Sequence, residues 1–434
     1  MDSSERSVIC SACEQFLSRR LGRIVVRRLL WLTSGISIVW TPQIAAQKFD
    51  SSVMRSVAPG IVHRRVVVNA GPWRVNVLEI DLRQPGVSIR AVRAHDSFGG
   101  RETVSSMVAR YNGPGKVVGA VNADFFNIRA SGESENNVVI EGRLWKGVKV
   151  TDSPYDTFDT IHSQFGVDWQ NHPFIERFEF EGSITGPDKR TVNLDALNFW
   201  PDSSALVLYT AVFGDSTPRD STRRHPLAVS LRSAGERGDT LLFQVAGEPR
   251  QGWSLPLTGG AALLASGKRR SELPLLVSRR GLIKVVPHLG PDRGRLRTVV
   301  GGWPRLIVHG QSVAAQADSL EGTFPRFSRE RHPRTAVGFS ADSSKVFLIT
   351  VDGRRESDSG MSLVELARLM LDLGVYEGMN FDGGGSTTMV VDGQVVNSPS
   401  DKTGERAVGS GLLVVIDAPP QALGRAASNS LRRK

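Results

Sequence analysis

Residues 334–355 read RTAVGFSADSSKVFLITVDGRR and hold two apolar runs separated by a short polar stretch at 341–345. Each run has the length and β-branched content of a strand, and the polar stretch has the composition of a turn. In an antiparallel hairpin, the start of the first strand lies beside the end of the second. The sequence therefore predicts that Arg334, Asp352 and Arg354 cluster at one edge of a sheet. An ordinary surface ion pair is the alternative that needs no function.

Strand signals of the same kind dominate the rest of the chain, as in 64–68 and 75–82. Further apolar runs are joined by dipeptides that end in glycine, a pattern typical of hairpin turns. These dipeptides are Glu141-Gly142, His309-Gly310 and Asp392-Gly393. The region 171–300 holds several short strand signals and charged loops. It could be a second lobe, although no linker sets it apart.

Two helices are expected among these strands, over 102–111 and 362–373. In the second, Ser362 and Glu365 have the spacing of a capping box, and Gly374 has the position of a helix stop. The sequence therefore predicts an α+β fold with a β-rich mixed sheet core and a few packed helices.

Residues 380–388 read NFDGGGSTT, and three consecutive glycines before a strand are hard to explain as structure. Glycine contributes no packing and costs backbone entropy, whereas successive N–H groups in such a turn can form an anion-binding nest. Asp382 precedes the glycines, and Ser386 and Thr387 add hydroxyl groups. This pattern favours acid–base or nucleophilic chemistry on a phosphorylated or glycosidic substrate. No lysine follows the glycines, so the stretch is not a P-loop.

The run 117–127, VVGAVNADFFN, is an apolar strand that ends in polar residues. Asn122 and Asp124 lie at that end, where side chains often point into a site. A strand-end turn over a phenylalanine core is the structural alternative.

The ends of the chain carry most of its net charge of +10. Residues 1–46 hold +3 and the tail 419–434 holds +4, which leaves +3 on the body. A nearly balanced body with 7% aromatic residues and no basic–aromatic interleaving argues against nucleic acid as a partner. The basic stretch, apolar run and small residues of 1–46 are typical of a signal peptide or N-terminal anchor. The tail has the composition of a disordered end.

The leader pattern predicts an exported protein, periplasmic or secreted and possibly anchored at its N-terminus, with no membrane span in the mature body. Cys10 and Cys13 both lie in the leader, so the body has no cysteine. No metal-ligand motif is present and no cofactor is expected. A divalent cation on Asp124, Asp352 or Asp382 is neither suggested nor excluded. No sequence feature indicates an oligomeric state.

The sequence resembles the phosphodiester glycosidase family over about 60–416, which implies a single domain although 434 residues would suit two or three. The core of the resemblance is N-F-D-G-G-G-S with R-T-A-V-G and D-G-R upstream. The matching segments are Asn122 with Phe126, Tyr209-Thr210, Gly214–Thr217, Gly301–Pro304, Pro333–Gly338, Val351–Arg354, Ser359–Leu363, Glu365–Ala367, Asn380–Thr387, Asn397–Asp401 and Gly404–Arg406. One departure is Asp124, where the family's lysosomal member has glycine.

The resemblance implies hydrolysis of a sugar-1-phosphodiester, such as an N-acetylglucosamine-1-phosphodiester, at the glycosidic bond. Asp382 and Asp352 are the expected catalytic carboxylates. The phosphate and the sugar would be held by Asn122, Asp124, Arg334, Thr335, Arg354, Asn380, Gly383, Gly384, Gly385, Ser386, Thr387 and Arg406. The alternative is a non-catalytic glycan- or phosphate-binding protein of exopolysaccharide biosynthesis or export. An acid beside the anion argues against it, because like charges repel.

Overall fold

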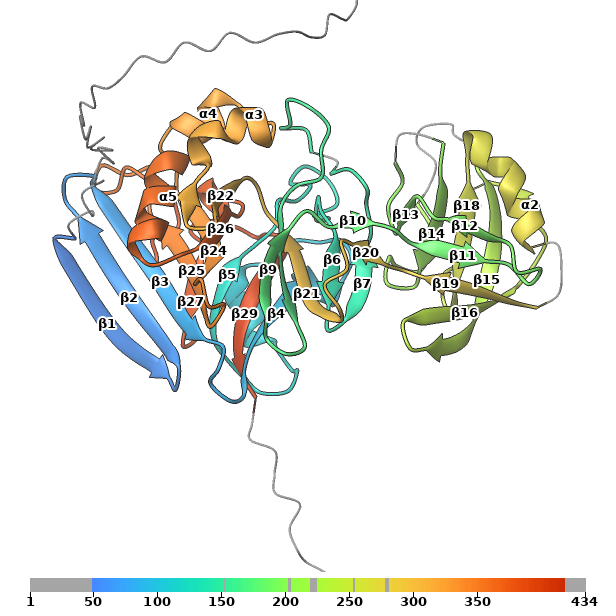
Figure 1. The fold of residues 1–434 in the computed structure, drawn as a ribbon, viewed down its shortest axis with the longest axis horizontal. Coiled ribbons are helices and arrows are strands. Elements are labelled where there is room, and N and C mark those ends of the chain that lie inside the picture. The colour runs from blue at the N-terminus through green and yellow to red at the C-terminus, as the bar shows by residue number, and fades with distance from the viewer. Residues whose placement is uncertain are drawn as a thin grey trace, which may run out of the picture. The chain divides into compact units, whose positions relative to one another are not determined.

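The computed structural model describes residues 49–151, 153–201, 204–218, 225–252, 254–277 and 281–417 (Figure 1). The expected leader at 1–46, with Cys10 and Cys13, and the expected tail at 419–434 lie outside these ranges. The chain from Ala46 onward forms one compact unit. Its described part is rich in strands and has few, short helices, so the predicted α+β class is confirmed.

An eight-stranded antiparallel sheet is built around the predicted hairpin. Its strands run in the order β1 (Ser51–Ala58), β2 (Ile61–Val68), β3 (Trp73–Asp81), β25 (Lys345–Val351), β24 (Arg334–Phe339), β26 (Glu377–Asn380), β22 (Arg305–Val308) and β23 (Gln311–Ser312). Strands β24 and β25 pair from Arg334 opposite Val351 to Phe339 opposite Val346. The sequence prediction of this hairpin is confirmed.

The central strands of this sheet are buried on both faces, which explains their continuous apolar runs. In β25, Val346 and Leu348 enter one core, whereas Phe347 and Ile349 enter the core on the other face. Helix α5 (Leu363–Asp372) covers that second face, as Figure 1 shows. Its capping box forms as predicted.

A five-stranded antiparallel sheet shares the first core. Its order is β28 (Gln394–Val395), β27 (Met389–Val391), β5 (Lys116–Asn122), β29 (Ser410–Ile416) and β4 (Val87–Arg93). A second five-stranded sheet adds Phe165, Val167 and Val300 to the same core. Its order is β7 (Arg143–Lys146), β6 (Val138–Ile140), β21 (Leu296–Gly301), β8 (Gln164–Asp168) and β9 (Pro173–Glu176). The ends of β5, β24 and β26 frame the site described below.

Residues 183–286 form a nine-stranded sheet with its own apolar core. Eight strands follow the order β12 (Thr191–Asn193), β11 (Ser183–Thr185), β19 (Leu282–Val286), β16 (Thr240–Val245), β15 (Leu227–Arg237), β18 (Gly260–Ala265), β14 (Leu206–Thr210) and β13 (Ala196–Leu197), and β17 (Arg250–Gln251) pairs with β15. The short pair β10 (Glu179–Phe180) and β20 (Leu289–Gly290) adjoins it in sequence. Val139 and Val299 join the core of this sheet to β6 and β21.

The other helices are short. They are α1 (Val104–Ala109), α2 (Glu272–Val277), α3 (Ala317–Leu320) and α4 (Pro325–Arg329), with 3-10 turns η1 (Ala94–Asp96), η2 (Gly267–Ser271), η3 (Ala314–Gln316) and η4 (Gly384–Ser386). Helix α1 is shorter than the predicted 102–111, because Thr103 caps it and Glu102 pairs with Val408 instead. No helix in the described ranges is long and apolar enough to cross a membrane.

Candidate functional site

A cavity of about 300 Å³ opens where the glycine turn meets the ends of β5 and β24. Its lining combines charged side chains with a set of aromatic ones, which we call the aromatic wall: Phe125, Phe126, Tyr155, Trp303, Phe324 and Phe327. The lining residues are Phe125, Phe126, Ile128, Glu135, Tyr155, Trp303, Phe324, Phe327, His332, Arg334, Arg354, Asp382, Gly383, Gly384, Gly385 and Arg406. A larger cavity of about 470 Å³ lies between the 141–144 turn and the β15–β16 hairpin, but none of the predicted site residues line it.

Arg354 and Arg406 pack directly on the glycine turn. A Cβ added to Gly384 would come within 2.9 Å of the Arg354 guanidinium, and one added to Gly385 would come within 2.0 Å of Arg406. Gly384 also has φ +61, a conformation that favours glycine. The glycines are therefore needed because two arginine side chains occupy the space that their own side chains would fill.

The anion-nest interpretation of the turn is wrong for three of its amides. The N–H of Gly384 donates to the carbonyl of Pro333 at 2.8 Å, and those of Ser386 and Thr387 donate back into the turn at 3.1 and 3.3 Å. These amides are already used within the protein. They are therefore not free to bind an anion, whereas the guanidinium groups of Arg354 and Arg406 lie beside the turn.

The three arginines of the cavity differ in how they are held. Arg334 is buried, and its guanidinium donates to the carbonyls of Met361 and Phe327 at 2.9 and 2.6 Å. Burial and the nearby Arg354 lower the pKa of Arg334 to about 9. Arg406 forms a two-point ion pair with Asp401, at 2.7 and 2.9 Å.

Arg354 is exposed, and within the described ranges it has no hydrogen-bond or ion-pair partner. Its backbone has φ +62 at the end of the β24–β25 hairpin. The predicted proximity of Arg334 and Arg354 is confirmed, since both line the cavity. An exposed guanidinium without a carboxylate partner is well suited to bind a phosphate.

Asp382 lies at the start of the glycine turn and is partly exposed to the cavity. Its amide donates to the carbonyl of Ala123 at 3.0 Å, which fixes the turn to the end of β5. Desolvation raises the pKa of the Asp382 carboxyl to about 6, while Ser386 and Arg406 oppose that rise. Near neutral pH this carboxyl is therefore ionised but close to its pKa.

Glu135 is a buried acid on the same cavity, and our reading of the sequence did not single it out. Burial, together with the nearby Asp124 and Asp382, raises its pKa to about 8. One of its carboxyl oxygens has no hydrogen-bond partner. The cavity lining therefore includes two acids with separated pKa values, Asp382 near 6 and Glu135 near 8.

Asn122 and Asn380 hold the frame of the site. The Asn122 amide donates to the carbonyl of Asp382 at 2.6 Å, and its oxygen accepts from the Thr335 hydroxyl and the Thr388 amide at 2.8 and 3.1 Å. Asn380 donates to the carbonyl of Trp303 at 2.7 Å. These side chains tie the ends of β5, β24 and β26 together, and their expected contact with a sugar stays a prediction.

Asp124 lies behind the cavity lining. It accepts from the backbone and side-chain amides of Asn136 at 3.2 and 2.8 Å. A side chain at Gly301 would collide with it, since an added Cβ would lie 2.3 Å from its carboxyl. Burial raises the pKa of Asp124. Asp124 therefore holds the segment that carries Glu135 and adds negative charge beside it.

Asp352, the second predicted carboxylate, does not line this cavity. It accepts from the amide of Ser398 at 2.9 Å, and burial raises its pKa to about 6. It is absent from the cavity lining, as are Asn122, Asp124, Thr335, Asn380, Ser386 and Thr387. The hydroxyl of Thr387 is buried without a hydrogen-bond partner. The catalytic role of Asp352 stays a prediction.

No group of three or more His, Cys, Asp or Glu side chains among the described residues could hold a metal ion. Seven of the fourteen predicted positions line the cavity. Six of them belong to the glycine turn or pack on it, and the seventh is the buried Arg334. Sequence reasoning missed the aromatic wall and Glu135. The signal for Glu135 was its position in a polar run, Ser134–Asn137, just before the apolar strand β6.

The chain matches a family model and several known proteins. Residues 243–415 match the model of the phosphodiester glycosidase family. N-acetylglucosamine-1-phosphodiester alpha-N-acetylglucosaminidase from Bos taurus is 39% identical over 93 residues, which are 21% of this chain and 17% of that protein. The Homo sapiens protein of the same name is 36% identical over 93 residues, 21% of this chain and 18% of that protein.

Two solved structures share the fold. A hypothetical protein from Synechocystis has a TM-score of 0.64 at 19% identity, and the match covers 84% of this chain and 64% of that one. A protein from Burkholderia pseudomallei, named as a putative exported protein, has a TM-score of 0.60 at 24% identity, and the match covers 80% of this chain and 74% of that one.

The resemblance to the phosphodiester glycosidase family is therefore confirmed. The matched stretch spans less than a fifth of the length of the two curated relatives. Arg334, Arg354, Asp382 and Arg406 lie within the family match at 243–415, whereas Glu135 lies outside it.

Proposed function

We propose that this protein hydrolyses sugar-1-phosphodiesters at the glycosidic carbon–oxygen bond. The observation that carries the proposal is one cavity that combines unpaired Arg354 with two acids, Asp382 and Glu135, of different pKa. A phosphodiester places an anion beside a sugar carbon, so its hydrolysis needs a cation for the phosphate and carboxyls for the sugar carbon. The match to the phosphodiester glycosidase family supports the same chemistry.

In this mechanism Arg354 and Arg406 bind the phosphate oxygens and stabilise the charge that develops on them. Asp382, ionised at neutral pH, acts at the sugar carbon as nucleophile or as the base for a water molecule. Glu135, protonated at neutral pH, donates its proton to the oxygen that leaves with the phosphate. We thus propose Glu135, in place of the expected Asp352, as the partner of Asp382.

Arg334 has a supporting role in this mechanism. Its guanidinium is held by backbone carbonyls, and its positive charge lies behind Arg354 on the cavity floor. A fixed buried cation strengthens the field at the phosphate position because surrounding water cannot screen it fully.

The test is hydrolysis of UDP-N-acetylglucosamine by the full chain in ¹⁸O-labelled water. Cleavage at the glycosidic bond places ¹⁸O in the released sugar, whereas cleavage at phosphorus places it in the phosphate. We expect unlabelled UDP, which is the decisive readout because the anomeric oxygen of the released sugar exchanges with water through ring opening. Label in the phosphate would contradict the glycosidase assignment.

Two variants test the role of the unpaired guanidinium. Arg354→Ala should lower kcat/KM at least about tenfold, since a charge-assisted contact to phosphate is lost. Arg355→Ala is the matched control, because its side chain donates to the carbonyl of Pro399 and does not line the cavity. Binding of the intact substrate without turnover in any arm would favour the alternative, a non-catalytic glycan- or phosphate-binding protein.

We also propose that the protein is exported and acts on envelope or extracellular glycan phosphodiesters. The leader pattern at 1–46 supports this, and the related Burkholderia pseudomallei protein is described as exported. Fractionation of cells that express the full chain tests it. Recovery in the cytoplasmic fraction alone would contradict export.

A further inference from the structure

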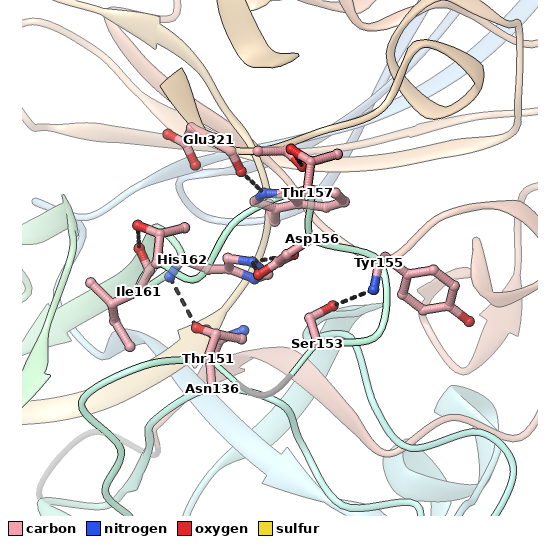
Figure 2. Close-up of polar contacts among 12 residues, drawn as sticks. Asn136, Thr151, Ser153, Tyr155, Asp156, Thr157, Ile161, His162 and Glu321 are labelled. Carbon is pink, nitrogen blue, oxygen red and sulfur yellow. Dashed lines mark hydrogen bonds and ion pairs between the residues drawn. The ribbon is translucent and has the colours of Figure 1, made fainter. Parts of the chain in front are cut away.

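A segment without helix or strand, residues 153–161, contributes one side chain to the cavity lining. It connects β7 to β8, and the side chain that lines the cavity is that of Tyr155. The Tyr155 side chain is 44% exposed, unlike the buried Phe125 and Trp303 of the aromatic wall. Figure 2 shows Tyr155 projecting away from the polar contacts that hold the rest of the segment.

The base of the segment is closed by Thr151. Its amide donates to the carbonyl of Thr160 at 3.0 Å, and its hydroxyl accepts from the amide of His162 at 3.0 Å. The same hydroxyl donates to Asn136 at 2.8 Å, next to the cavity acid Glu135. On the other side, both the amide and the hydroxyl of Thr157 donate to the carbonyl of Gly322, at 2.9 and 3.0 Å.

The residue after Tyr155 is held by a buried histidine. His162 Nε2 lies 2.9 and 2.8 Å from the two carboxyl oxygens of Asp156 (Figure 2). The His162 ring is fully buried, and its Nδ1 has no hydrogen-bond partner. Because one ring nitrogen is already unpaired, loss of Asp156 would leave the whole imidazole without a hydrogen-bond partner on its side chain.

The same imidazole is part of a stack that reaches the cavity floor. His162 stacks on Trp303 at 5.1 Å, and Trp303 stacks on Phe327 at 4.9 Å. The Arg334 guanidinium lies 5.0 Å over the Phe327 ring. The anchor of the segment and the cationic floor of the cavity are therefore in continuous contact through two aromatic side chains.

The cavity lining thus combines two chemically different sets of side chains. Arg354 and Arg406 suit a phosphate, and the aromatic side chains suit the apolar face of a sugar ring. An exposed tyrosine offers a large apolar surface at low cost in conformational entropy. Its neighbour Phe158 is about as exposed, at 43%, but does not line the cavity.

We propose that Tyr155 is a specificity-determining residue that packs on the sugar ring of the substrate, and that Asp156 and His162 are positioning residues that hold it there. This inference rests on the proposed function, because it assigns the sugar side of the same cavity. The phosphate side belongs to the arginines.

The test compares two probes, N-acetylglucosamine 1-phosphate and inorganic phosphate, by titration calorimetry on the full chain. Tyr155→Ala should weaken binding of the sugar phosphate about tenfold, the range of a lost aromatic contact, and leave inorganic phosphate unchanged. Tyr155→Phe should recover the lost affinity, and Phe158→Ala is the matched control. Equal weakening of both probes, or of neither, would overturn the role of Tyr155.

The positioning role has its own readout. Asp156→Ala should weaken the sugar phosphate as Tyr155→Ala does, and the double variant should be no weaker than either single one. Hydrogen exchange in peptides over 153–161 should accelerate in Asp156→Ala but not in Tyr155→Ala. Additive losses, or unchanged exchange in Asp156→Ala, would overturn the positioning role.

These outcomes separate the two proposals. A wild-type chain that hydrolyses no glycosyl phosphodiester, yet shows the probe-selective loss in Tyr155→Ala, contradicts the hydrolase and supports the sugar contact. If the Tyr155→Ala variant releases sugar normally and binds both probes normally, that result contradicts the sugar contact and leaves the hydrolase proposal standing.

Discussion

The cavity region and the nine-stranded sheet bury different kinds of side chain. Among the described residues of 183–286, the buried polar side chains are all uncharged, namely Asn198, Thr210, Thr217 and Ser266. The cavity region buries Asp124, Glu135 and Arg334. Burial of charge opposes folding unless the charge is well paired. The nine-stranded sheet therefore has a core that favours stability, whereas the cavity region buries charged groups at a cost in stability.

The largest effect is expected from removing the ionised acid of the cavity, Asp382. Asp382→Asn should lower kcat by about 10³-fold, within the range of a lost acid–base or nucleophilic group, and should leave the fold intact. The measurement is steady-state release of sugar from a glycosyl phosphodiester. Asp392→Asn, in an exposed turn away from the cavity, is the matched control. Undiminished release by Asp382→Asn would exclude its catalytic role.

Next in size is the pH dependence of the acid pair. Activity needs Asp382 ionised, which occurs above pH about 6, and Glu135 protonated, which occurs below pH about 8. We therefore expect a bell-shaped profile of kcat/KM between these values. Glu135→Gln should lower activity by about 10²-fold and remove the alkaline limb. An unchanged alkaline limb in that variant would assign it to another group.

The buried acid Glu135 should also make the stability of the folded protein depend on pH. Since the pKa of Glu135 is higher in the folded state than its ordinary value of 4.5, its folded state favours the protonated form. Its contribution to stability is therefore present below pH about 4.5 and is lost as pH rises through about 8. Glu135→Gln should then unfold at a higher temperature than wild type at pH 9, with little difference at pH 4. Thermal melts at both values check this.

A smaller effect is expected from the glycine turn. Gly385→Ala places a Cβ about where the Arg406 guanidinium lies, 2.0 Å from its Nη2, so Arg406 must move from its ion pair with Asp401. We expect KM to rise about tenfold, as for a lost contact to phosphate, with a smaller change in kcat. Gly247→Ala, where an added Cβ meets no atom within 4 Å and φ, as at Gly385, lies outside the left-handed region, is the matched control.

The smallest effect on catalysis should come from the nine-stranded sheet. Leu263→Ala, in the buried centre of β18, should lower the free energy of unfolding by about 2–5 kcal/mol. It should leave KM for the phosphodiester unchanged at a temperature where the protein stays folded. Denaturant unfolding and steady-state kinetics together test it. A large change in KM would show that the two regions are not independent.

The sequence predicted structure well where the interacting residues lie close together in the chain. The β24–β25 hairpin and the capping box of α5 depend on residues close in the chain, and both formed as expected. Because Arg334 and Arg354 lie at paired strand ends, their meeting also followed from the hairpin.

Features that depend on distant segments were not predictable. Glu135 is buried beside cavity residues that lie far from it in the chain, such as Trp303 and Asp382, and its position in the polar run Ser134–Asn137 does not indicate that burial. The glycine run indicated a special backbone, yet sequence alone does not distinguish amides that bind an anion from space needed by arginines elsewhere in the chain. The structure supports the second reason for Gly384 and Gly385.

The three glycines differ in what a substitution would displace. At Gly383 the neighbour is the backbone carbonyl of Pro333, 2.7 Å from an added Cβ, and a carbonyl within the chain cannot swing aside. At Gly384 the neighbour is the free end of Arg354, which can. Substitutions at the three glycines should therefore differ in their structural consequences. Replacement of Gly383 meets a backbone carbonyl, replacement of Gly384 meets the Arg354 side chain and also strains a backbone at φ +61, and replacement of Gly385 displaces only side chains.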